Sequence, residues 1–242
     1  MDLTRMLHEK KFYAAVLIAF MGILLGSTWP ERKEGELLAC GTFLTMVSDS
    51  LKSRTVLFFL PIASVLPCGE EYLRERQWKF LRFLVIRKGK EEYCRDKVFT
   101  TAVSGALVWA SASVLGMLFF FLLFFAHEEV RSYPEEVITG LFTVSGRVCL
   151  EASAMASLSA VLGTVSGSSY VSLGLPFVLY YSLMILRERY LDEIYAIDPA
   201  EWILGKCSWA GEQRGLWIFL LLLVMGLAAL HWVVLEKGLE EI

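Results

Sequence analysis

The chain has 242 residues, of which 56% are apolar or aromatic and 20% are charged, and its formal net charge at pH 7 is −3. Soluble domains carry about 25% charged residues, which interrupt their apolar stretches, whereas the apolar residues here form long blocks. This composition excludes a soluble enzyme, a nucleic-acid-binding domain and a disordered protein. We therefore expect an all-α, polytopic membrane protein with a single domain over residues 1–242.

Six apolar segments reach or approach the length of about 20 residues that a membrane-spanning helix needs. The second segment contains Pro61 and Pro67, and it is long enough only if it begins near residue 51. The apolar stretch 37–47 is too short to span and predicts an interfacial or re-entrant piece. We expect six transmembrane helices at about 12–29, 51–69, 98–126, 137–162, 170–186 and 216–235.

The distribution of Lys and Arg predicts the orientation. With the N-terminus inside, thirteen basic residues fall on the inner side and nine on the outer side, and Arg147 lies within a span. An excess of Lys and Arg marks the cytoplasmic loops of membrane proteins. We therefore expect a multi-pass protein of the cell membrane with both termini in the cytoplasm.

The cysteines, histidines and glycines form no pattern that predicts a metal site, a disulfide framework or a nucleotide-binding loop in this chain. The five cysteines are scattered and form no C-x-x-C pair, so neither a zinc site nor a disulfide framework is predicted, although a bond between Cys40 and Cys207 stays open. No G-x-x-x-x-G-K-[ST] loop is present to cradle nucleotide phosphates. We expect no catalytic residue, no metal site and no cofactor in this chain.

The segment 70–97, between the second and third expected spans, is the most informative. Trp78, Leu81 and Val85 recur at helical spacing among Arg and Lys residues, and Gly89 permits a turn after them. This pattern predicts an amphipathic cytoplasmic helix. Such a helix can lie on an anionic leaflet, or it can dock a partner protein and pass movement to the span that follows.

The same segment carries a longer pattern. An acidic pair with an aromatic residue is followed by a basic residue, a leucine-containing stretch, a second basic residue, and then a Tyr and a Lys at the start of the third span. These residues are Glu70-Glu71-Tyr72, Arg76, Lys79-Phe80-Leu81, Arg87, Tyr93 and Lys97. Pattern and placement resemble the cytoplasmic coupling segment of ABC-2-type permeases. The sequence departs from that family at residues 75–78, where Glu-Arg-Gln-Trp replaces a common small-Gly pair.

A second stretch strengthens the resemblance. Tyr190-Leu191 and residues 197–202, with Pro199 among them, are similar to the Pro-containing outer segment that precedes the last span of that family. The resemblance covers nearly the whole chain in layout and about 30 residues in motif. The motif part is the Glu70–Lys97 segment described above.

The resemblance implies a function. The chain would be the transmembrane subunit of an ABC exporter that moves a hydrophobic or amphipathic substrate, peptide or lipid-like, with ATP and Mg bound by a separate P-loop ATPase subunit. It would pair with a second permease subunit, as a homodimer or a heterodimer, among membrane lipids and without nucleic acid. The residues expected to couple it to the ATPase are Glu70, Glu71, Tyr72, Arg76, Trp78 and Lys79.

The fourth expected span carries two charges and a row of small residues. Arg147 and Glu151 are four residues apart and so share a helix face, where they predict an ion pair or the lining of a transport path. Ala152, Ala156 and Ala160 recur at a spacing that lets helices approach closely. We expect close helix packing along this span.

Two other functions compete with the exporter. A non-transporting membrane scaffold or a peptide-immunity protein fits the same composition and needs no ATPase. An intramembrane protease is a remote alternative, because Arg74 and Arg76 miss the spacing of an EExxxR motif after Glu70 and Glu71. The histidines of the chain, His8, His127 and His231, also do not form the pattern that such proteases use.

Overall fold

The computed structural model describes residues 2–29, 37–78, 81–129, 133–191, 193–209, 211 and 213–240. Within these residues the protein is all-helical, and a bridge between Leu38 and Glu128 is its one extended pairing. The shorter elements are α1 (Asp2–Leu7), α5 (Glu71–Gln77), α6 (Leu81–Lys88), η1 (Phe125–His127), η2 (Tyr195–Ile197) and α10 (Pro199–Leu204). The longer ones are α2 (Lys10–Gly26), α3 (Thr42–Leu51), α4 (Arg54–Val65), α7 (Lys90–Phe124), α8 (Glu135–Ser166), α9 (Ser169–Tyr190) and α11 (Gln213–Glu240).

Among the described residues, four helices are long and apolar enough to cross a membrane: α7 with η1, α8, α9 and α11. At 1.5 Å per residue, the 35 residues of α7 extend about 52 Å, which exceeds the hydrocarbon thickness of about 30 Å. The chain therefore has the architecture of a multi-pass membrane protein. The first and second expected spans remain predictions, because α2 has 17 residues and α4 has 12.

The second expected span does not begin at residue 51. The chain turns at Lys52, and the Ser53 hydroxyl accepts a hydrogen bond from the backbone N–H of Val56 at 3.2 Å, which caps a new helix that starts at Arg54. The preceding helix α3 ends at Leu51 and is largely buried. Serine favours this position because its hydroxyl satisfies a free backbone donor. Lys52 and Ser53 therefore form a break between two helices, where the sequence predicts a continuous first turn of a span.

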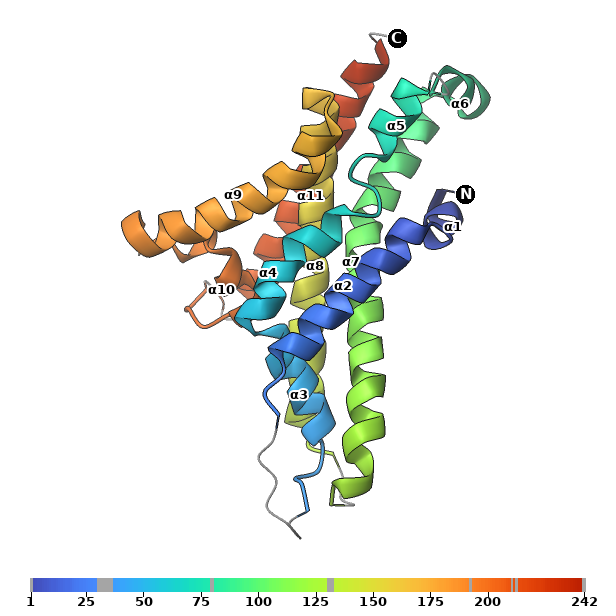
Figure 1. Ribbon diagram of the computed structural model, residues 1–242. Coiled ribbons are helices and arrows are strands. Elements are labelled where there is room, and N and C mark those ends of the chain that lie inside the picture. The colour runs from blue at the N-terminus through green and yellow to red at the C-terminus, as the bar shows by residue number, and fades with distance from the viewer. Residues whose placement is uncertain are drawn as a thin grey trace.

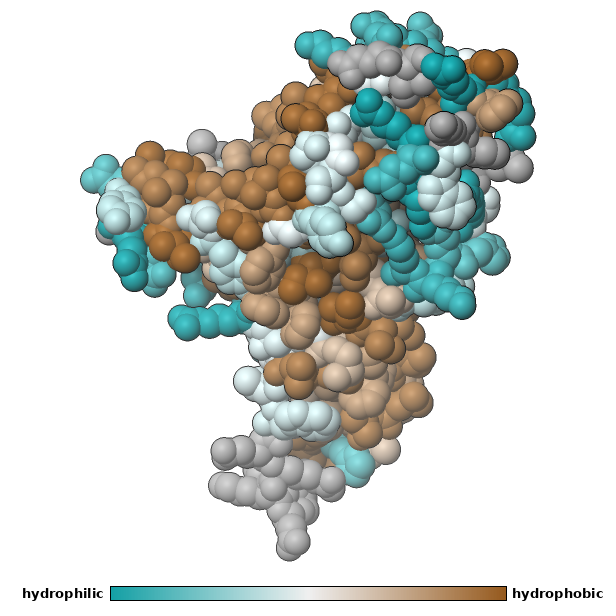
Figure 2. All heavy atoms as spheres, turned by 45° about the horizontal axis from the view of Figure 1, so that its top comes forward, coloured by the Kyte–Doolittle hydropathy of each residue, from teal (hydrophilic) through white to brown (hydrophobic). Residues whose placement is uncertain are grey.

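Helix α8 lies at the centre of the bundle. In its most apolar stretch 72% of the residues are buried, against 17% in α9 and α11. It runs beside α7 and α11, with α2 and α4 crossing in front of them (Figure 1). The predicted close packing is present where Gly105 of α7 meets Ala152 and Ala156 of α8. Figure 2 shows apolar side chains covering much of the body of the molecule, including the projecting helix α9.

Both described ends of the chain lie at the same end of the bundle, together with α5 and α6, whereas α3 lies toward the opposite end (Figure 1). A small hydrophobic cluster at that end packs α5 and α6 against α7 and α11 through Tyr72, Leu81, Tyr93 and Leu235. We call this region the terminal end. It is the end that the distribution of Lys and Arg predicts to lie in the cytoplasm.

Candidate functional site

A buried ionic network fastens α5 to the first turns of α7. Lys97 is 2% exposed, and its Nζ lies 3.1 Å from Glu71 Oε2 and 2.9 Å from Glu75 Oε1. The Tyr93 hydroxyl donates a hydrogen bond of 2.6 Å to Glu75 Oε2. Glu71 and Glu75 are one helical turn apart and so present both carboxylates on one face of α5. The network joins residues from the two ends of the 70–97 segment.

The α5 region is also tied to the N-terminal part of the chain. Glu70, directly before α5, pairs with Lys11 of α2. Arg74 Nη2 donates to Glu9 Oε1 at 3.1 Å. Charged contacts therefore tie this seven-residue helix both to α7 and to the N-terminal segment that contains Glu9 and Lys11.

Beyond these contacts, α5 and α6 expose both basic and apolar side chains. Arg76 is exposed and Trp78, at the end of α5, is 78% exposed. On α6, Phe83 and Ile86 are 70% and 83% exposed. Lys79 lies outside the described residues. We call Arg76, Trp78, Phe83 and Ile86 the coupling surface.

The single amphipathic helix expected here is, in the described residues, two helices, α5 and α6. Leu81 is buried as the pattern predicts and Val85 is half-buried. Trp78 does not share that buried face and instead projects outward. Gly89 follows α6 with a φ of 87°, a left-handed value that glycine adopts at little cost, and this allows the turn into α7.

The structure describes five of the six residues expected to couple the chain to a partner, and these five fall into two groups. Glu70 makes an ion pair within the chain, and Glu71 and Tyr72 are buried. Arg76 and Trp78 face outward. The buried group can position α5, whereas contact with a partner falls to the exposed group. The role of each group in coupling to an ATPase stays a prediction.

Sequence reasoning missed Glu75 and assigned no structural role to Lys97. Two signals mark them. Glu75 stands four residues after Glu71, so both carboxylates fall on one helix face. Lys97 borders a long apolar run, where an ammonium group needs an acidic partner.

The predicted ion pair between Arg147 and Glu151 is not formed. Arg147 is 4% exposed, and its Nη1 donates to the backbone carbonyl oxygen of Ile203 at 3.2 Å. That carbonyl is in the last turn of α10, where unpaired carbonyl groups and the helix dipole favour a cation. Gly205, with a φ of 58°, ends α10 against the guanidinium group. Arg147 therefore anchors α10 to α8.

Glu151 is the most deeply buried acid in the described part of the chain. It is 0% exposed, and neither carboxylate oxygen has a hydrogen-bond partner among the described residues. Tyr180 of α9, which is also fully buried, lies next to the Glu151 carboxylate. The two residues join α8 to α9 inside the bundle, and a role in a transport path stays a prediction.

The described residues contain no group of three or more His, Cys, Asp or Glu side chains that could hold a metal ion. The five cysteines, all within the described ranges, are free thiols, so Cys40 and Cys207 are not bonded to each other. Desolvation raises the pKa of the Cys207 thiol, and the nearby Glu201 carboxylate raises it further. This thiol is therefore protonated at neutral pH.

No family model, curated protein or solved structure matches the chain.

Proposed function

We propose that this chain is the transmembrane subunit of an ATP-driven exporter of the ABC-2 type, which works with a separate P-loop ATPase and a second permease subunit. Its substrate would be hydrophobic or amphipathic, peptide or lipid-like. One observation carries the proposal. Three of the residues that give the 70–97 segment its resemblance to a coupling segment, Glu71, Tyr93 and Lys97, come together in the buried network, where Glu75 binds both Tyr93 and Lys97.

The network supports the proposal because coupling requires a rigid connection. A force applied to a flexible loop would be lost in loop motion. Here α5 is joined by charged contacts to α7, whose helix continues without a break for 35 residues. A displacement of α5 would therefore move a candidate membrane span directly.

The coupling surface supports the proposal from the partner's side. Interface hot spots are enriched in Trp and Arg. Trp78 and Arg76 are both exposed at the end of the molecule that we expect in the cytoplasm, where a soluble ATPase can reach them. Exposed Phe83 and Ile86 extend the apolar part of this surface.

The test is affinity purification of the tagged chain from native membranes in mild detergent, with quantitative mass spectrometry. We expect a P-loop ATPase at about one copy per chain. The double variant Arg76→Glu/Trp78→Ala should recover at least about tenfold less ATPase, since interface residues of these types dominate binding energy. The matched control is Arg189→Glu/Tyr190→Ala, a neighbouring cation and exposed aromatic residue at the far end of α9.

Two results would contradict the proposal. Recovery of no ATPase with the unaltered chain, under conditions that keep a known exporter intact, would favour a scaffold or an immunity protein. Equal loss of the ATPase in both double variants would show that the coupling surface has no specific role.

A further inference from the structure

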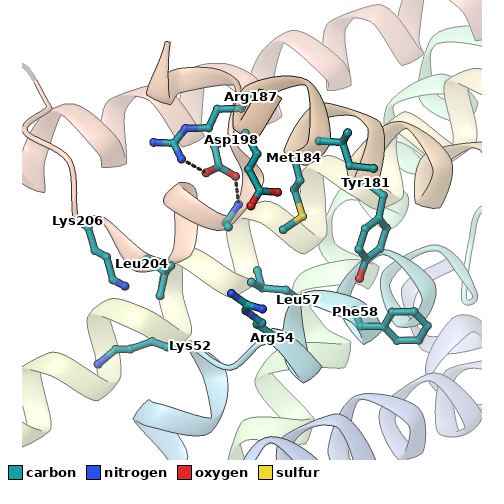
Figure 3. Close-up of a pocket in the computed structure, with 13 residues that line it drawn as sticks. Lys52, Arg54, Leu57, Phe58, Tyr181, Met184, Arg187, Asp198, Leu204 and Lys206 are labelled. Carbon is teal, nitrogen blue, oxygen red and sulfur yellow. Dashed lines mark hydrogen bonds and ion pairs between the residues drawn. The ribbon is translucent and has the colours of Figure 1, made fainter. Parts of the chain in front are cut away.

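A cavity of about 650 Å³ lies between the start of α4, the last turns of α9, and α10 with the loop that follows it (Figure 3). Small-molecule sites in proteins have volumes of about 300–1,000 Å³. The cavity is therefore large enough for a headgroup and part of a chain. It shares no residue with the coupling surface or with the buried network around Lys97.

Charge and apolar surface are separated within the cavity. Figure 3 shows Lys52, Arg54 and Lys206 on one side of the pocket, and Phe58 and Tyr181 on the other. The aromatic rings of Phe58 and Tyr181 lie 6.0 Å apart, so they form a continuous apolar wall. A ligand that fits both walls has an anionic group at one end and a hydrocarbon part at the other.

Some of the cations on this side of the cavity are not neutralised by a carboxylate of the described residues. Among the described residues, the cavity is lined by the cations Lys52, Arg54, Arg187 and Lys206 and by the carboxylates of Glu188 and Asp198. Of these carboxylates, Asp198 is already engaged, because it lies 3.8 Å from Arg187 and accepts the backbone N–H of Ala200 at 3.0 Å to cap α10. Lys52 already lies 3.6 Å from Asp49. Arg54 and Lys206 form no ion pair with any residue that the structure describes. Arg187 Nε is buried without a hydrogen-bond partner in the same set of residues.

The apolar side is open to the surface of the bundle. Phe58 on α4 is 43% exposed and Ile185 on α9 is 51% exposed. Since α9 is a candidate span, its exposed apolar face meets lipid acyl chains. A hydrocarbon chain can therefore enter from the bilayer while the headgroup remains near the cations.

We propose that this cavity binds an anionic phospholipid, with its phosphate group held by Arg54, Arg187 and Lys206 and an acyl chain along Phe58 and Tyr181. Guanidinium groups hold phosphate oxygens through paired hydrogen bonds, and ammonium groups add a point charge. A zwitterionic lipid carries a cation next to its phosphate and gains less from this wall. The inference does not depend on the exporter proposal, because the site needs no ATPase.

The experiment measures binding of phosphatidylglycerol and phosphatidylcholine to the purified full-length chain in detergent by native mass spectrometry. We expect phosphatidylglycerol to bind at least about tenfold more tightly, since each cation near a membrane surface contributes about fivefold. The double variant Arg54→Gln/Lys206→Gln should abolish this preference. The control is Arg95→Gln/Arg189→Gln, which removes two exposed cations outside the cavity.

A second variant and a second ligand separate an amphiphile site from a simple anion site. Phe58→Ala should weaken phosphatidylglycerol binding at least about threefold, because the apolar contact with the acyl chain is lost. The affinity for inorganic phosphate, measured by competition, should stay unchanged. Thermal unfolding of each variant confirms that it is folded. Equal binding of the two lipids to the unaltered chain would overturn the proposal. So would displacement of phosphatidylglycerol by inorganic phosphate at equal concentration, which would indicate a free-phosphate site.

Discussion

Lys97 shows how one buried charge determines the position of a helix. An ammonium group that is 2% exposed is tolerated only with acidic partners at hand, and here Glu71 and Glu75 supply them. Burying a charged pair costs desolvation free energy, so the network is not in itself a large source of stability. Its effect is positional, because two ion pairs from one face of α5 hold that helix against the start of α7.

Removal of the ammonium group should therefore destabilise the protein strongly. Lys97→Met leaves two buried carboxylates without a cation, and we expect a loss of about 3–5 kcal/mol in the free energy of unfolding. The triple variant Glu71→Gln/Glu75→Gln/Lys97→Met removes all three charges and should recover most of that loss. Thermal unfolding in detergent measures both. Equal destabilisation by the single and triple variants would show that the ion pairs are not what Lys97 contributes.

The geometry of Arg147 and Glu151 predicts that exchanging them will fail. In an isolated ion pair, Arg147→Glu/Glu151→Arg would preserve the contact. Here Arg147 instead bonds the Ile203 carbonyl, and Glu151 is enclosed next to Tyr180. The exchange places a carboxylate against a carbonyl oxygen and a guanidinium in an enclosed space.

We expect the exchanged protein to unfold at a clearly lower temperature than the unaltered one, with a loss of at least about 3 kcal/mol. Glu151→Gln keeps the shape and removes a carboxylate that lacks hydrogen-bond partners in the described chain, so it should be as stable as the unaltered protein. Thermal unfolding checks both variants. An exchanged protein of unaltered stability would mean that the two residues act as a pair after all.

At the scale of elements, the long apolar helices are the part of the fold that sequence predicts well. The expected span 137–162 lies within α8, and 216–235 lies within α11. The pattern succeeds because a continuous apolar run of that length has few alternatives to a membrane helix. It misses the break at the start of the expected span 51–69, where Ser53 caps a new helix, since a local cap is a weak signal inside an apolar run.

Helices α7 and α8 can approach closely because residue 105 is a glycine and has no side chain. Any Cβ at Gly105 would collide with the backbone carbonyl of Ala152 and crowd Ala156. Gly105→Leu should therefore lower the stability by more than about 3 kcal/mol, because the helices must move apart. Gly226→Leu in α11 is the matched control, since no atom lies within 4 Å of a Cβ built there.

Gly226→Leu should leave stability equal or slightly higher, because glycine costs about 1 kcal/mol inside a helix. Thermal unfolding of the two variants decides the question. Similar stability of both would show that α7 and α8 can separate without loss, and that the small residues of α8 are not required for packing.

At the scale of the whole molecule, the sequence predicts where along the chain the candidate site lies, but not which of its side chains are buried and which are exposed. The sequence marked residues 70–97 through their charges and aromatic residues. It did not reveal that Glu71 faces inward and Trp78 outward, because the contacts that decide this come from α2 and α7. The bond between Arg147 and the Ile203 carbonyl was out of reach, since a backbone acceptor 56 residues away leaves no trace in a side-chain pattern.

The buried network also has a consequence for how the chain is made. Synthesis proceeds from the N-terminus, so the carboxylates of Glu71 and Glu75 leave the ribosome before the ammonium of Lys97, which they neutralise. The two carboxylates are therefore synthesised before their counterion and before α7 is inserted. A chain cut in the exposed turn at Gly89 would divide the charges between two fragments, and each fragment would lack the counterion that lets it mature. We therefore expect the two fragments to reach a stable fold only when they are produced together.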